Sequence, residues 1–291
     1  MEQLLILGNG FDLSLGLHTK FSNFKEFISE KNNTLTKLLE YYYIYEYDKL
    51  GTEADFWKYF EAALEYPTRE ATDSQGSDIY SNPILNYDEK QIEELIRNLK
   101  LSLDEWIAEI EPSIDEIKDE KVSEYCKIVK EADFIINFNY TGTVEKKYPN
   151  TSEKVFHIHG KDKKIIGHKG SEESTSKREV GYTTIDQQRG GNDQELLNML
   201  VNSTEKPVSK CQINLFNKID SGIVYGLVST IGFSFSEVDC YYLKKLYDNG
   251  NITDTTRWNI GYHLDSEKAD FKRVLSKYIN VEDGYISFTK Y

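Results

Sequence analysis

The sequence predicts an α/β fold in which a doubly wound, mostly parallel sheet is interrupted by a large helical insertion. Short apolar runs typical of buried strands occur at the start of the chain and again after residue 131. Between them, apolar side chains in residues 34–130 recur at three- and four-residue spacing, which indicates amphipathic helices. We therefore expect a discontinuous α/β core of residues 1–33 and 131–291 and a helical insertion of residues 34–130.

The first elements are a strand, a glycine-rich turn and a helix. Residues 3–7 form a continuous apolar run that ends at Gly8, as in a strand buried on both faces of a parallel sheet. Residues 21–28 show helical spacing. Within the insertion, residues 72–86 are rich in Ser, Asp and Asn and indicate an exposed loop. We interpret the tyrosine-rich residues 41–47 as a packing surface, and expect the insertion to join copies in a homo-oligomer.

The rest of the chain alternates between strands and helices. Strands are expected at residues 133–137, 155–159, 223–231 and 257–262, and helices at residues 236–247 and 266–278. Residues 161–191 lack periodicity and indicate a loop whose lysines are solvated. Parallel strands need crossover connections, so this alternation favours an open sheet that binds its ligand at the carboxyl ends of the strands.

Composition narrows the range of functions. The 291 residues carry 35 basic and 49 acidic side chains, a net charge of -14 at pH 7, which disfavours nucleic acid as a partner. The three cysteines, Cys126, Cys211 and Cys240, are widely spaced and are expected to be reduced. No apolar stretch reaches the roughly 18 residues of a membrane span, and the first residues do not resemble a secretory signal. We expect a cytoplasmic protein without membrane contact.

Polar and glycine-rich segments follow four of the predicted strands. They lie at residues 8–12, 137–141, 157–160 and 232–239. Because the carboxyl ends of parallel strands share one edge of a sheet, we expect these segments to converge on a ligand cleft.

The first segment is a GxG turn. Gly8 and Gly10 would let backbone N–H groups approach a phosphate at the start of a helix. The dinucleotide fingerprint GxGxxG is incomplete, since Leu13 replaces its third glycine. Asp12 would repel a pyrophosphate but could accept a hydrogen bond from a ribose hydroxyl. The alternative is that Asp12 caps the helix and the glycines only form a tight turn.

Two histidines alternate at the end of a predicted strand. His157 and His159 would share one face and could hold a metal, but no cysteine or carboxylate with metal-ligand spacing accompanies them, so we expect no metal. We favour His159, beside Gly160, as the histidine exposed to a ligand, because an imidazole suits general-base work near neutral pH. His157 is interpreted as a packed core histidine.

Asn137 and Asn139 also alternate after a strand. A side-chain amide can orient a water or a ribose hydroxyl without adding charge, and the alternative is an Asx turn at the strand end. Asp239, near the start of a predicted helix, could contact a ligand or serve as a partner of the helix dipole.

Several segments, taken in order, resemble the bacteriophage abortive infection AbiH family. They are residues 5–13 (LILGNGFDL), 16–19 (GLHT), 138–141 (FNYT), 157–160 (HIHG), 232–234 (GFS) with Asp239, and 258–263 (WNIGYH). The resemblance spans nearly the whole chain. It implies a role in antiviral defence, with a phage-derived trigger.

The same order of segments is similar, more distantly, to sirtuin-like NAD-binding domains, which implies a Rossmann-like sheet. On this resemblance Asn139 matches an asparagine that positions water or ribose, and His159 matches a histidine that acts as a base. The residues implied to contact the nucleotide are Gly8, Asn9, Gly10, Phe11, Asp12, Tyr140, Thr141, Gly232, Ser234 and Asp239. Thr141 replaces a frequent aspartate, and no four-cysteine zinc module occurs, which argues against a protein deacylase.

The leading hypothesis is an abortive-infection effector that binds a nucleotide, NAD, and hydrolyses its nicotinamide–ribosyl bond, as an NAD glycohydrolase-like enzyme does. The first alternative is a non-catalytic nucleotide sensor that acts on a protein partner through the insertion. The second is a metal-dependent nuclease in which His157, His159 and Asp239 hold the metal, although the net charge weighs against it.

Overall fold

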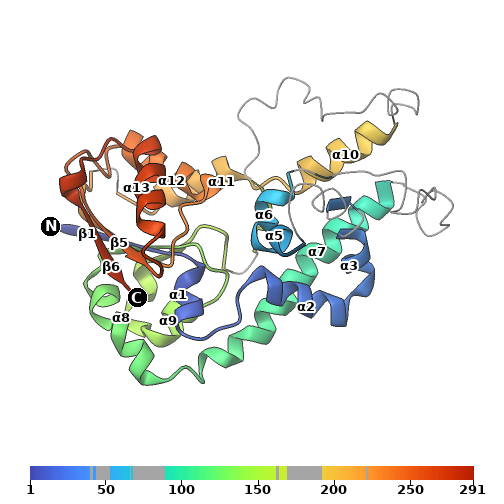
Figure 1. The fold of residues 1–291 in the computed structure, drawn as a ribbon, viewed down its shortest axis with the longest axis horizontal. Coiled ribbons are helices and arrows are strands. Elements are labelled where there is room, and N and C mark those ends of the chain that lie inside the picture. The colour runs from blue at the N-terminus through green and yellow to red at the C-terminus, as the bar shows by residue number, and fades with distance from the viewer. Residues whose placement is uncertain are drawn as a thin grey trace. The chain divides into compact units, whose positions relative to one another are not determined.

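The computed structural model describes residues 1–39, 42–43, 53–65, 67, 89–161, 164–168, 192–220 and 222–291. It contains a six-stranded parallel sheet with the strand order β3-β2-β1-β4-β5-β6 (Figure 1). The strands are β1 (Glu2–Leu7), β2 (Phe134–Asn137), β3 (Val155–His157), β4 (Tyr225–Ile231), β5 (Arg257–Tyr262) and β6 (Ile286–Lys290). The predicted α/β fold with a parallel sheet is confirmed.

The strand order reverses between β1 and β4. At the carboxyl end of β1, Leu7 pairs with Asn137 of β2 on one side and with Ile231 of β4 on the other. The chain runs outward from β1 to β3 in one half of the sheet and from β4 to β6 in the other. This is the order of Rossmann-like dinucleotide-binding sheets, which bind their ligand where the order reverses.

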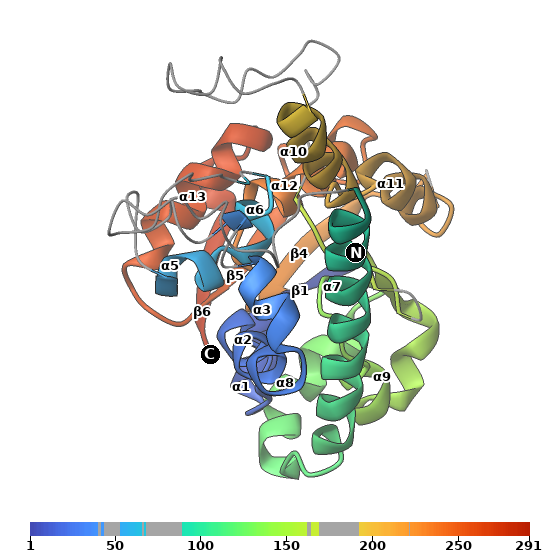
Figure 2. The same ribbon diagram turned by 90° about the vertical axis from the view of Figure 1, so that its right-hand side faces the viewer.

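One compact unit contains the sheet and comprises Met1–Lys20, Trp106–Lys164 and Val208–Tyr291. Helices α8 and α9 lie on one side of the sheet, and α12 and α13 lie on the other (Figures 1 and 2). The helical elements of this unit are α1 (Asn9–Ser14), η3 (Glu111–Ile114), α8 (Asp119–Glu131), α9 (Thr143–Lys147), η4 (Pro149–Lys154), α11 (Val208–Phe216), α12 (Glu237–Asp248), α13 (Glu267–Tyr278) and η6 (Asp283–Tyr285).

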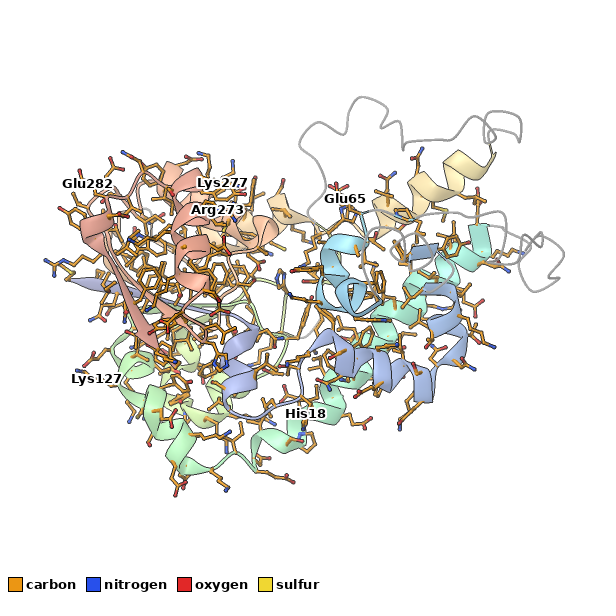
Figure 3. All side chains as sticks on the ribbon, in the orientation of Figure 1. His18, Glu65, Lys127, Arg273, Lys277 and Glu282 are labelled. Carbon is orange, nitrogen blue, oxygen red and sulfur yellow. The ribbon has the colours of Figure 1, made fainter. Side chains whose placement is uncertain are left out.

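The core of this unit is formed by the central strands of the sheet, which are buried on both faces. Leu4, Leu5, Ile6 and Leu7 of β1 are at most 1% exposed, as expected for a continuous apolar run. Charged side chains such as Lys127 and Arg273 are exposed on α8 and α13 (Figure 3). Among the described residues, no helix is both long enough and apolar enough to cross a membrane.

The other compact unit comprises Phe21–Glu105 and Ile165–Pro207. Its core is aromatic: Trp57 stacks on Phe60 with ring centroids 4.9 Å apart, and Phe56 meets Phe60 edge-on at 5.4 Å. A buried Lys206 pairs with Glu61 at 2.8 Å. The helices are α2 (Phe21–Lys31), α3 (Asn33–Leu39), α5 (Glu53–Lys58), α6 (Phe60–Ala63), α7 (Glu89–Ile110), which ends in the first unit, and α10 (Asn192–Ser203).

Several expected elements differ from the structure. The strand expected at residues 155–159 ends at His157, because the chain turns there and Gly160 N–H donates back to His157 O (3.3 Å) with Gly160 at φ +77°. The elements that were not predicted include the helices α9, α10 and α11 and the edge strand β6. Tyr42 and Tyr43 are buried, in line with the packing interpretation. The other residues of 41–47, the expected loop at 72–86, and Lys163 and Lys169 lie outside the described residues.

Candidate functional site

Glycine backbones join the turns that follow β1 and β4. Gly8 N–H donates to Ile231 O and Gly10 N–H donates to Gly232 O, both at 3.0 Å. A Cβ on Gly8 would lie 2.4 Å from Gly232 O, one on Gly10 would lie 2.5 Å from Gly232 Cα, and Gly232 itself has φ +61°. Glycine is therefore required for this close approach. The two N–H groups that we expected at a phosphate are used inside the protein instead, because the β4 turn is their neighbour.

The helix α1 begins directly after Gly8 and buries the carboxylate of Asp12, which is 1% exposed. Thr141 Oγ1 donates to Asp12 Oδ2 at 2.5 Å, and Thr141 Oγ1 lies 2.9 Å from Thr143 Oγ1. Burial raises the pKa of Asp12 from 3.8 to about 6, although hydrogen bonds from Thr141 and Thr143 and the charge of His157 lower it. In the described part of the chain, Asp12 Oδ1 has no hydrogen-bond partner.

Two other residues of the first segment have structural contacts. Phe11 is fully buried and meets the ring of Tyr125 edge-on, with centroids 5.4 Å apart. The exposed Asn9 donates from Nδ2 to Thr19 O at 2.9 Å. These contacts hold α1 in place.

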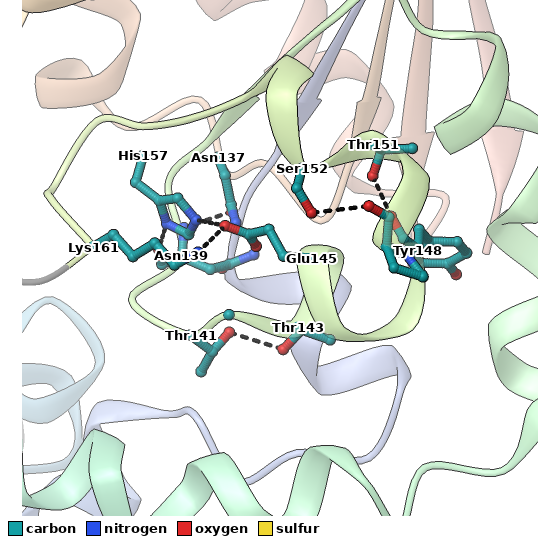
Figure 4. A network of polar contacts seen from close by, with 12 residues as sticks. Asn137, Asn139, Thr141, Thr143, Glu145, Tyr148, Thr151, Ser152, His157 and Lys161 are labelled. Atoms are coloured by element: carbon teal, nitrogen blue, oxygen red, sulfur yellow. Dashed lines mark hydrogen bonds and ion pairs between the residues drawn. The ribbon is translucent and has the colours of Figure 1, made fainter.

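The two asparagines after β2 have different surroundings. Asn137 Oδ1 accepts from Asn139 N–H at 3.0 Å, so Asn137 forms an Asx-type turn at the strand end (Figure 4). Asn139 is 4% exposed, and among the described residues neither Oδ1 nor Nδ2 of Asn139 has a hydrogen-bond partner. The amide of Asn139 is therefore available to a ligand or a water.

His157, the last residue of β3, lies in a charged network (Figure 4). Its Nε2 lies 2.9 Å from Glu145 Oε1, and its Nδ1 lies 3.2 Å from Asn139 O. Both neighbours are acceptors, an arrangement that only the doubly protonated imidazole satisfies fully. Lys161 Nζ donates to the same Glu145 oxygen at 2.9 Å. Burial raises the pKa of Glu145, but the hydrogen bonds from His157 and Lys161 and the charge of His157 outweigh it and bring the pKa to about 2.

His159 lies in the turn beyond β3 and is 3% exposed. Its ring packs against those of Phe138 and Tyr140, each with centroids 5.7 Å away, and its Nε2 lies 3.7 Å from Asp239 Oδ1. The side chains of His157 and His159 are 5% and 4% exposed, so the expected contrast between a packed His157 and an exposed His159 is not seen.

Asp239 lies in the first turn of α12, as the sequence predicts. Ser236 Oγ accepts from Asp239 N–H at 3.2 Å and donates to Asp239 Oδ2 at 2.8 Å, which caps the helix. Ser234 is exposed in the turn before it, where Phe235 adopts φ +54°.

Sequence reasoning missed Thr143, Glu145 and Glu111. Thr143 continues the alternation of residues 137, 139 and 141, which could have identified it. Glu111 accepts from Gly142 N–H at 2.7 Å and pairs with Lys146 at 3.0 Å. It lies 31 residues before Gly142 in the sequence, so no local pattern indicates this contact. In the described ranges, no group of three or more His, Cys, Asp or Glu residues has an arrangement that could hold a metal.

Comparison with known proteins identifies a family. The family model described as bacteriophage abortive infection AbiH matches residues 4–262, a range that includes every site residue named above. No significant match was found among curated proteins or among solved structures.

Proposed function

Since the chain belongs to the bacteriophage abortive infection AbiH family, which indicates a role in abortive infection, we propose that it acts as an effector that hydrolyses NAD. The proposed reaction breaks the nicotinamide–ribosyl bond and yields nicotinamide and ADP-ribose. The enzyme is expected to act when infection supplies a phage-derived trigger.

The observation that carries this proposal is the placement of polar side chains along the carboxyl edge of the sheet, on the β3-β2-β1 side of the point where the strand order reverses. Asp12 follows β1, Asn139 follows β2 and His159 follows β3, all at the carboxyl edge of one parallel sheet. Sheets of this strand order bind dinucleotides at that edge, so the choice of a dinucleotide rests on analogy of fold. The buried acid, amide and imidazole supply the chemistry that the reaction needs.

The proposed reaction passes through an oxocarbenium-like state at the ribose carbon that loses nicotinamide. Water then forms a new C–O bond at this carbon, and its proton must be accepted by a base. His159 takes the proton in this proposal, and the Asp239 carboxylate at 3.7 Å stabilises the resulting imidazolium. Asn139, with its buried amide, orients the water or a ribose hydroxyl.

The proposal is tested by incubating the purified protein with NAD and measuring nicotinamide release, with and without lysate of phage-infected cells. His159→Ala is expected to lower the rate by about 10²–10⁴ without a matching change in melting temperature. His18→Ala, at an exposed histidine of the same unit (Figure 3), is the matched control. Full release by folded His159→Ala would refute the role of His159. NAD binding without any release would favour the sensor instead.

A further inference from the structure

Buried polar atoms without protein partners gather in the loops after β1 and β2. Within the described part of the chain they include Asp12 Oδ1 and both Oδ1 and Nδ2 of Asn139. The two loops are connected by the hydrogen bond from Thr141, two residues after Asn139, to Asp12. Because an unsatisfied buried polar atom costs about 1–3 kcal/mol, three such atoms together indicate a group that is bound here when the protein works.

The chemistry of these atoms selects the kind of group. When Asp12 is ionised, its Oδ1 can accept a hydrogen bond but cannot donate one. Asn139 Oδ1 is also an acceptor, and Asn139 Nδ2 is a donor. Two neighbouring hydroxyls match this set, since each hydroxyl both donates and accepts. An ammonium group would satisfy the two acceptors but would leave the Asn139 donor without a partner.

A phosphate is disfavoured at the same place. The Asp12 carboxylate would repel it. The backbone donors of the adjacent turn are already used: Gly8 and Gly10 donate to the β4 turn, and Phe11 N–H donates to Gly8 O at 2.9 Å. This part of the site is therefore suited to a neutral group rich in hydroxyls.

We infer that Asp12 and Asn139 form a subsite for the vicinal diol of a ribose, so that the phosphates of a bound nucleotide lie outside this subsite. The choice of a nucleotide as the carrier of the ribose rests on the proposed function. The assignment of a diol rests on the unsatisfied atoms themselves and does not depend on hydrolysis.

Binding of ADP-ribose tests the inference without turnover, because ADP-ribose no longer carries the nicotinamide bond. Calorimetry compares wild-type affinity for ADP-ribose with that for an analogue whose terminal sugar lacks the 2′- and 3′-hydroxyls, and inorganic pyrophosphate serves as the phosphate probe. Loss of the diol is expected to weaken binding about 10- to 100-fold, the effect of one or two hydrogen bonds to a charged or buried partner. Because the phosphates bind outside this subsite, the affinity for pyrophosphate should be the same in wild type and in variants of Asp12 and Asn139.

Protein variants test whether Asp12 and Asn139 cause the preference for the ligand that carries the diol. Asp12→Asn and Asn139→Leu should each reduce the ratio between the two affinities toward one, whereas Asn150→Leu, at an exposed asparagine, should leave it unchanged. Melting curves show whether each variant folds, and Asn139→Asp, which replaces the donor by an acceptor at equal size, is the second variant at that position.

The outcomes separate the subsite from the reaction. A wild-type preference for the diol that the variants lose supports the subsite even when NAD releases no nicotinamide, a result that would overturn only the hydrolysis. Equal affinity for the two ligands, no binding of either, or a preference that survives in both folded variants overturns the subsite, including when nicotinamide release is observed.

Discussion

The buried carboxylate of Asp12 is expected to reduce stability at neutral pH. Its pKa rises from 3.8 to about 6, and burial is the largest cause. Because the folded protein binds this proton more tightly than the unfolded chain, stability falls as pH rises from about 4 to about 6. Two pKa units correspond to about 3 kcal/mol, at about 1.4 kcal/mol per unit. Asp12→Asn carries no charge at any pH and escapes this loss.

The measurement is urea unfolding of wild type and Asp12→Asn at several pH values. The variant also introduces a buried amide donor, but the cost of that donor is the same at each pH and cancels in the comparison. As pH rises from below 4 to above 6, the free energy of unfolding of the variant should increase by about 3 kcal/mol relative to that of wild type. About half of this increase should fall between pH 5 and pH 7.5. Glu111 and His157 are the charged neighbours that act on Asp12 in opposite directions, so the result tests the net effect.

Asp115→Asn, at an exposed carboxylate, is the matched control for this series. A difference between Asp12→Asn and wild type that stays constant with pH would refute the reasoning, because the buried charge would then carry no penalty.

Three further predictions concern the same unit. Thr141→Val removes a hydrogen bond that lowers the pKa of Asp12, so the loss of stability with rising pH should extend to higher pH than in wild type. Loss of stability over the same pH range as in wild type would contradict this. Gly232→Ala places a Cβ 2.2 Å from Phe11 N and should lower the free energy of unfolding by about 2–4 kcal/mol, against about 1–2 kcal/mol for Gly250→Ala, where nothing lies within 4 Å. Glu145→Gln should lower the free energy of unfolding by at least about 1 kcal/mol at neutral pH. The difference in stability between wild type and the variant should disappear as pH falls from 4.5 toward 2. Equal melting temperatures at neutral pH would contradict this prediction.

Local sequence patterns determined most of the strands and two of the helices of the sheet-containing unit. A strand buried on both faces must be apolar throughout, so β1, β2, β4 and β5 could be located from the sequence to within about two residues. The helices α12 and α13 were likewise predicted from the spacing of their apolar side chains. The edge strand β6 was missed because its alternating ISFTK segment is short and only partly buried. The end of β3 was misplaced because the strand-like run of residues 155–159 continues past His157, although the chain already turns there and Gly160 N–H donates back to His157 O.

The sequence by itself also identified the segments that carry polar chemistry, because loops after parallel strands meet at one edge. Only the tertiary structure decided what each residue does there. Strand order, which places the β4 turn against Gly8 and Gly10, depends on hydrogen bonds between residues more than 200 positions apart. The burial of Asp12, the unsatisfied amide of Asn139 and the contact of His159 with Asp239 arise from the packing of separate loops, and a pKa or a free hydrogen-bonding atom is a property of that packing, not of local residue order.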